Sequence, residues 1–359
     1  MQKKRNCGID MLKILCMFFI VIQHIVGHGG ITQNNEFAFN INYEVAWLIK
    51  CFVLCAVDCY AMASGYLLYD SNIKLSRLFK LWVQIETYSV LCFVGTQVMS
   101  GNPIFSVAFI KSFFPILSKQ YWYTTIYFGL FFLIPFYNHI IKSFTQKQMK
   151  KWLITFFIII CVIPSIINFD LFETPTGSLL WMSICYFVGA YIHKYNIRCD
   201  KALLLYSVGA LVMWCSKFLI DIGTMMLVGG IGWGQWFISF TSPFCVISAL
   251  GLFLYFVSKN DIFEKCNKQF ENIANMTLAV YLIHDNFNFK QCFIKDKFTG
   301  LVDDNTIIMI FVIFGSSMII FVFSVAVESI RRKLMHSFTD RIGYKLSKFD
   351  QYFMIEELK

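Results

Sequence analysis

The chain has 359 residues, of which 57% are hydrophobic and only 15% are charged. Because an average soluble domain carries about 25% charged residues, this composition excludes an ordinary soluble protein and predicts a polytopic membrane protein. The formal net charge of +9 could suggest a nucleic-acid-binding protein. However, the basic residues gather between the apolar stretches, where they indicate membrane topology instead.

Ten apolar stretches meet the length of about 20 residues that a helix needs to cross a bilayer. They cover residues 10–27, 45–69, 80–99, 122–141, 152–168, 178–193, 202–221, 236–258, 272–289 and 306–330. We therefore predict an all-α fold, with a membrane domain of about ten transmembrane helices over residues 1–330. The polar remainder, 331–359, is predicted to be a cytoplasmic tail, either amphipathic and resting on anionic lipid or simply solvated.

Lysine and arginine are distributed unequally between the two sets of connecting segments. Successive connecting segments lie on alternate sides of the predicted membrane. The side that contains the N-terminus and the tail holds 23 of these residues, whereas the opposite side holds 5. Because positive residues are retained on the cytoplasmic side, this ratio predicts that both termini are cytoplasmic. We expect a multi-pass protein of a cell membrane, most simply the bacterial cytoplasmic membrane.

The first apolar stretch carries three ionisable residues, Asp10, Lys13 and His24. On a helix, the eleven positions from Lys13 to His24 return to within about 20° of the same face and rise roughly 16 Å. Ionisable groups in a membrane span are costly unless they face protein or a water-filled cavity, so they are candidates for function. A proton relay, a substrate site and a general base all fit this pattern.

Further polar residues follow in or beside the next spans. Asp58 lies in the second span, and Arg77 and Lys80 follow it as a basic pair. Such a pair fits a phosphorylated ligand, but it also fits an ordinary topology anchor. Trp122 and Tyr123 begin the fourth span, either as an interfacial aromatic belt or as a stacking platform for a sugar.

Later spans contain polar residues that have simpler explanations. Lys217 and Asp221, four residues apart, are predicted to pair with each other. By itself, His284 in the ninth span fits a hydrogen-bonded structural residue better than a catalyst. The thirteen cysteines never form Cys-x-x-Cys and fit small packing residues, so we expect no metal site.

Taken in order, these elements resemble the membrane-bound acyltransferase 3 family of O-acyltransferases, over about residues 5–330. The elements that carry the resemblance are Asp10 with Lys13 and His24 (the family's Arg-x10-His), Val57-Asp58 through Ser64-Gly65-Tyr66-Leu67, Arg77 with Lys80, Trp122 with Pro135, and Tyr281-Leu282-Ile283-His284. Two positions depart from the family pattern. Lys13 replaces the arginine, which makes any phosphate or thioester contact geometrically looser. Tyr127 stands where many members carry a glutamate.

The resemblance implies transfer of an acyl group, commonly acetyl, from cytoplasmic acyl-CoA to a hydroxyl of an extracytoplasmic glycan or lipid-linked acceptor. It implies acyl-CoA as donor substrate, with no permanently bound cofactor and no nucleic-acid partner. In that mechanism His24 acts as general base, and Asp58 or His284 orients its ring or shuttles the proton. The residues implied for CoA binding are Lys13, Arg77 and Lys80, with Asp10 beside them. Trp122 and Tyr123 are implied to bind the acceptor. An acyl-histidine relay is a variant of this mechanism.

Two other classes of protein stay open at this point. A proton-coupled transporter of a small polar solute would also carry a histidine and acids in its spans, although such proteins often show inverted repeats that we do not find here. A membrane sensor would signal through residues 331–359.

Overall fold

The computed structural model describes residues 6–71, 74–167, 178–259 and 268–350, and all regular structure in these ranges is helical. The longer helices are α1 (Cys7–His28), α2 (Ile41–Val53), α3 (Ala56–Leu68), α4 (Leu75–Ser100), α6 (Trp122–Ser143), α7 (Gln146–Phe156), α9 (Leu179–Lys194), α10 (Ala202–Val228), α11 (Pro243–Ser258), α13 (Lys268–His284) and α15 (Thr306–Ser347). The short ones are η1 (Asn35–Phe37), α5 (Val107–Ser112), η2 (Phe157–Val162), α8 (Ile163–Ile167), η3 (Gly234–Phe237), α14 (Phe287–Phe293) and η4 (Thr299–Val302).

Seven helical segments of the described chain are long and apolar enough to cross a membrane. They are Cys7–His28, Ile41–Leu68, Leu75–Ser100, Trp122–Ser143, Gln146–Ile167, Ala202–Val228 and Thr306–Ser347. The helices α9, α11 and α13 coincide with three further predicted spans but have only 16, 16 and 17 residues. The all-α, multi-pass fold is thus confirmed, whereas the number of spans and the side of the termini stay predictions.

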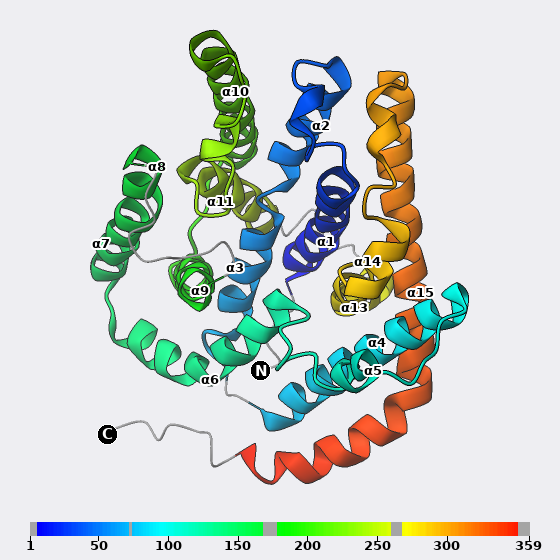
Figure 1. Cartoon of the computed structure of the whole chain (residues 1–359). Coiled ribbons are helices and arrows are strands. Elements are labelled where there is room, and N and C mark those ends of the chain that lie inside the picture. The colour runs from blue at the N-terminus through cyan, green and yellow to red at the C-terminus, as the bar shows by residue number, and fades with distance from the viewer. Residues whose placement is uncertain (1–5, 72–73, 168–177, 260–267, 351–359) are drawn as a thin grey trace.

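Helix α1 forms the centre of the bundle. Its first turn is capped by Asn6, whose side chain accepts a hydrogen bond from the backbone N–H of Ile9. The helix ends at His28, and the next residues include Gly30 with a left-handed φ of 99° that suits a glycine. Between these ends α1 packs against α2, α3, α11, α13 and α15, which surround it in Figure 1. Its polar side chains therefore face protein.

Close backbone contact joins α3 to α9. A Cβ atom at Gly65 would lie 1.9 Å from the carbonyl oxygen of Tyr186, and one at Gly189 would lie 1.9 Å from that of Met62. Small residues permit this approach between membrane helices, whose association depends on close packing. The contact fixes α3, which carries residues of the candidate site described below.

In two places the helices do not follow the predicted ranges. The predicted span 45–69 is divided into α2 and α3 at Leu54 and Cys55, where no proline or glycine marks the division. At the other end of the chain, α15 continues unbroken past residue 330 to Ser347. Its last part (red in Figure 1) lies beside α4. The helix continues because Arg, Lys, Leu and Met are good helix formers whatever their charge. Residues 351–359 of the predicted tail lie outside the described chain.

Candidate active site

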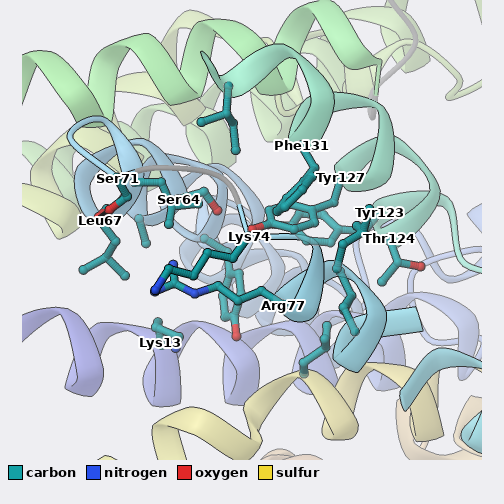
Figure 2. Close-up of a pocket in the computed structure, with 17 residues that line it drawn as sticks. Lys13, Ser64, Leu67, Ser71, Lys74, Arg77, Tyr123, Thr124, Tyr127 and Phe131 are labelled. Atoms are coloured by element: carbon teal, nitrogen blue, oxygen red, sulfur yellow. Dashed lines mark hydrogen bonds between the residues drawn. The ribbon is translucent and has the colours of Figure 1, made fainter. Parts of the chain in front are cut away.

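A cavity of about 310 Å³, which we call the lysine pocket, lies between α1, α3, α4 and α6. Its cations are Lys13 on α1, Lys74 just before α4 and Arg77 on α4. Lys74 and Arg77 are exposed, and in Figure 2 their side chains extend toward the α1 position of Lys13. Tyr127 lines the opposite, α6 side of the pocket. Three positive charges thus surround one partly enclosed space.

A second cavity of about 400 Å³, the histidine pocket, lies further along α1. His24 and His28 line it from α1, four residues apart on one face. Lys50 enters from α2, where its ammonium group lies 4.1 Å from the centre of the Trp47 ring. Aromatic residues complete much of the lining, namely Tyr60, Trp122, Tyr123, Phe240 and Tyr281. The predicted acceptor residues Trp122 and Tyr123 therefore lie in the same cavity as His24.

The two pockets meet at a partition formed by Tyr60, Tyr123 and Leu278, which line both. The rings of Tyr60 and Tyr123 meet edge to face, with centroids 6.1 Å apart. A hydrogen bond of 2.5 Å joins the Tyr60 hydroxyl to that of Thr277. The pockets are thus neighbours along α1, with Lys13 on one side of the partition and His24 on the other.

The imidazole of His24 lies within a cluster of polar groups. Its ring centroid is 4.8 Å from that of His284 and 5.0 Å from that of His28. Its Nδ1 lies 3.6 Å from Oδ1 of Asp285, which in turn forms a 2.8 Å ion pair with the ammonium group of Lys290. Because Nδ1 faces the carboxylate, Nε2 is the nitrogen left to act on another group.

His284 is fully buried, and its single side-chain hydrogen bond fixes one tautomer. Its Nδ1–H donates to the carbonyl oxygen of Val280, one turn earlier in α13. A neutral ring that donates from Nδ1 carries its lone pair on Nε2. Within the described chain, Nε2 of His284 has no hydrogen-bond partner. This histidine is therefore able to accept a proton close to His24.

Three predicted site residues lie elsewhere. Asp58 is buried and accepts a 2.8 Å hydrogen bond from the indole N–H of Trp181, so the structure does not bring it to His24. Lys80 forms a 2.6 Å ion pair with Asp340 on α15 and does not line the lysine pocket. Asp10 is buried in the first turn of α1 and lines neither pocket.

The sequence did not predict three residues that line the pockets, Lys74, His28 and Lys50, nor Asp285, which lies beside His24 but lines neither pocket. The first two were open to detection, because Lys74 precedes Arg77 by three residues and His28 follows His24 by one helical turn. Lys50 and Asp285 reach the site through the packing of α2 and α13 on α1. No local spacing indicates that packing.

The same cluster contains groups that could ligate a metal ion. One ligand atom each of His24, His28 and Asp285 lies within 4.8 Å of the others. However, the Asp285 carboxylate already pairs with Lys290. A cation would have to compete with that ammonium group, so the cluster fits a set of neighbouring proton-accepting groups better than a metal centre.

Comparison with known proteins identifies one family. A family model described as an acyltransferase domain matches residues 6–327. The matched range begins just before α1 and ends within α15. Neither a curated protein nor a solved structure matches the chain in the corresponding searches.

Proposed function

The chain belongs to the acyltransferase 3 family, and from this premise we propose that it transfers an acyl group, most simply acetyl, from acyl-CoA to a hydroxyl acceptor across a membrane. The acceptor we propose is a glycan or lipid-linked saccharide of the cell envelope, and the membrane is the bacterial cytoplasmic one. The donor would enter the lysine pocket and the acceptor the histidine pocket.

One observation carries this proposal: two cavities adjoin along α1, one with cations and the other with imidazoles. Lys13 and His24 are eleven residues apart, a rise of roughly 16 Å on a helix. An extended donor with charge at one end and a reactive group at the other suits such a pair of sites. Acyl-CoA has this form, because its phosphates and its thioester lie at opposite ends of the pantetheine arm.

The lysine pocket supports a polyanionic donor. Lys13, Lys74 and Arg77 approach it from two different helical segments, which suits a diphosphate that presents several oxygens. Charge-assisted hydrogen bonds to phosphate are roughly twice as strong as neutral ones. Lysine in place of arginine at position 13 supplies a point charge instead of a bidentate contact.

The histidine pocket supports general-base chemistry. We propose that Nε2 of His24 takes the proton of the acceptor hydroxyl as its oxygen attacks the thioester carbonyl carbon. The carbon–sulfur bond then breaks, and the CoA thiolate leaves and takes up a proton. The products are the acyl ester of the acceptor and free CoA.

The neighbours of His24 have supporting roles in this proposal. Asp285, 3.6 Å from Nδ1, would hold the ring orientation and stabilise the imidazolium that forms. His284, with its unpaired Nε2, would shuttle the proton. Trp122 and Tyr123 would stack against the sugar of the acceptor from the α6 side of the pocket.

The test uses the purified full chain in nanodiscs with acetyl-CoA labelled in the acetyl group and a crude envelope glycan fraction. We expect label on the glycan in a form released by mild base, as an ester is, with equimolar free CoA. The His24→Gln variant should give neither product. Movement of a solute into sealed vesicles that contain the chain, without covalent transfer, would favour the proton-coupled transporter and would overturn the proposal.

A further inference from the structure

A third cavity, of about 540 Å³, lies between α4 and the end of α15, and we call it the basic groove. Its volume is in the range of roughly 300–1,000 Å³ that is typical of small-molecule sites. The residues that line it from α4 are Arg77, Lys80, Leu81 and Gln84, and those from α15 are Arg331, Arg332, Met335, His336, Thr339 and Asp340. Four of these side chains are permanently cationic, so the groove is suited to an anion.

A buried carboxylate holds two of these cations in place. Glu328 is fully buried, and both of its oxygens accept hydrogen bonds of 2.7–2.8 Å from Arg331. The same carboxylate accepts a 2.7 Å bond from Nε of Arg332. One negative charge therefore orients two guanidinium groups, which leaves a net positive charge. Nη1 of Arg332 makes no hydrogen bond within the described chain and is left for a ligand.

The remaining acid of the groove is weakly held. Asp340 pairs with Lys80 at 2.6 Å and lies 3.2 Å from Nε2 of His336, but the three side chains are 45–75% exposed. Exposed ion pairs of this kind contribute little, typically below about 1 kcal/mol. A phosphate group can therefore replace Asp340 as the partner of Lys80 at small cost.

The basic groove is continuous with the lysine pocket. Arg77 and Leu81 line both cavities, so a ligand can extend from one into the other. The α15 side of the groove starts at Arg331, beyond residue 327 where the match to the acyltransferase family ends. These contacts thus belong to the extension of α15 in this chain.

We propose that the basic groove binds the adenosine 3′,5′-bisphosphate end of the acyl-CoA donor, with its 3′-phosphate on Arg332 and Lys80. This inference rests on the proposed function, because it assigns the far end of the same donor. The diphosphate would then lie near Arg77 and the lysine pocket, and the pantetheine arm would continue toward the partition. Leu81 and Met335 offer apolar walls for the nucleobase.

The test measures binding of adenosine 3′,5′-bisphosphate to the purified full chain in nanodiscs. This probe cannot react, so the result does not depend on acyl transfer. We expect saturable binding that Arg332→Gln weakens about tenfold or more, since one charge-assisted contact is lost. The matched control is Lys333→Gln, an exposed neighbour that does not line the groove and should bind as the wild type does. Equal affinity of Arg332→Gln and wild type, or no binding at all, would overturn the inference.

A second arm uses acetyl transfer with acetyl-CoA and with its 3′-dephospho analogue. We expect Arg332→Gln to raise KM about tenfold for acetyl-CoA and much less for the analogue. If the variant raises both values equally, Arg332 is only structural and the inference is wrong. If the wild type transfers from neither donor, the proposed function fails, whereas the binding arm still decides whether the groove is a nucleotide site.

The third arm separates nucleotide phosphate from lipid phosphate, because a lipid headgroup offers the same chemistry. Binding of adenosine 3′,5′-bisphosphate is compared in nanodiscs of phosphatidylcholine and in nanodiscs that also contain phosphatidylglycerol. We expect the nucleotide to bind with equal affinity in the two kinds of nanodisc. The Lys333→Gln variant, measured in both, corrects for the effect of lipid surface charge. Displacement of the nucleotide by phosphatidylglycerol in wild type but not in Arg332→Gln would assign the groove to lipid and contradict the inference.

Discussion

The lysine pocket and the histidine pocket lie at opposite sides of one partition, yet they hold their charged groups in different ways. In the lysine pocket, Lys74 and Arg77 are exposed and pair with no acid within the described residues. Beside the histidine pocket, His24 faces Asp285, and Asp285 is itself paired with Lys290. The first arrangement leaves cations available for a ligand, whereas the second places a carboxylate 3.6 Å from one ring nitrogen, beyond hydrogen-bond distance.

This difference indicates a division of labour along α1. Available cations contribute to binding of an anion, so their loss should change KM. A ring that accepts a proton in the reaction contributes to a chemical step, so its loss should change kcat. The following experiments test this division, beginning with the largest effect that we expect.

Replacement of His24 by glutamine should have the largest effect. Glutamine keeps polarity and similar size but cannot accept the proton, so we expect kcat to fall by about 10²- to 10⁴-fold, the usual value of general-base catalysis. Transfer of labelled acetyl under saturating donor measures this. The matched control is His139→Gln, an exposed histidine on α6 that should retain wild-type transfer. Full transfer by His24→Gln would refute the assigned role.

Asp285→Asn should lower kcat by about 10- to 100-fold, because one charge-assisted contact to the imidazolium is lost. The KM for acetyl-CoA should not change, since Asp285 lies on the histidine side of the partition. Steady-state kinetics at varied donor concentration measure both values. Asp303→Asn, at an exposed position, is the control. An equal change in KM and kcat would mean that Asp285 acts on the fold of α13 and α14 and not on His24.

Lys13→Ala should raise the KM for acetyl-CoA about tenfold and leave kcat nearly unchanged, because the lost contact is to the donor phosphates. The effect should weaken at high ionic strength, which screens the partly exposed charges of the pocket. The control is Lys147→Ala on α7, which is exposed and outside the pocket. An unchanged KM at low salt would remove Lys13 from donor binding.

Chelation should have the smallest effect. Although His24, His28 and Asp285 could ligate a metal ion, Lys290 occupies the carboxylate. We therefore expect that EDTA followed by gel filtration leaves the rate of transfer unchanged, and that elemental analysis finds no stoichiometric zinc. Loss of transfer that zinc restores would replace the set of proton-accepting groups described above by a metal centre.

Features that depend on spacing along one helix could be predicted from the sequence. On any α-helix, two residues eleven positions apart lie on nearly the same face. The shared face of Lys13 and His24 on α1 therefore follows from periodicity alone. The pairing of Lys217 with Asp221 is confirmed for the same reason, at 3.0 Å. The ammonium group of Lys217 also lies 2.6 Å from Glu44 on α2, which one-helix reasoning does not reveal.

Features that depend on packing between helices could not be predicted. Asp285 reaches His24 only because α13 packs against α1. The division of the second span at Leu54 and Cys55 has no proline or glycine to indicate it. The sequence does show a change of charge at Arg331, but charge does not end a helix, so α15 continues and forms the basic groove.

The most direct test of the division between the two pockets is equilibrium binding of CoA to the His24→Gln and Lys13→Ala variants, measured side by side in nanodiscs. We predict that His24→Gln, which has lost transfer, binds CoA with wild-type affinity, and that Lys13→Ala binds it about tenfold more weakly. Weakened binding in His24→Gln with wild-type binding in Lys13→Ala would contradict the account.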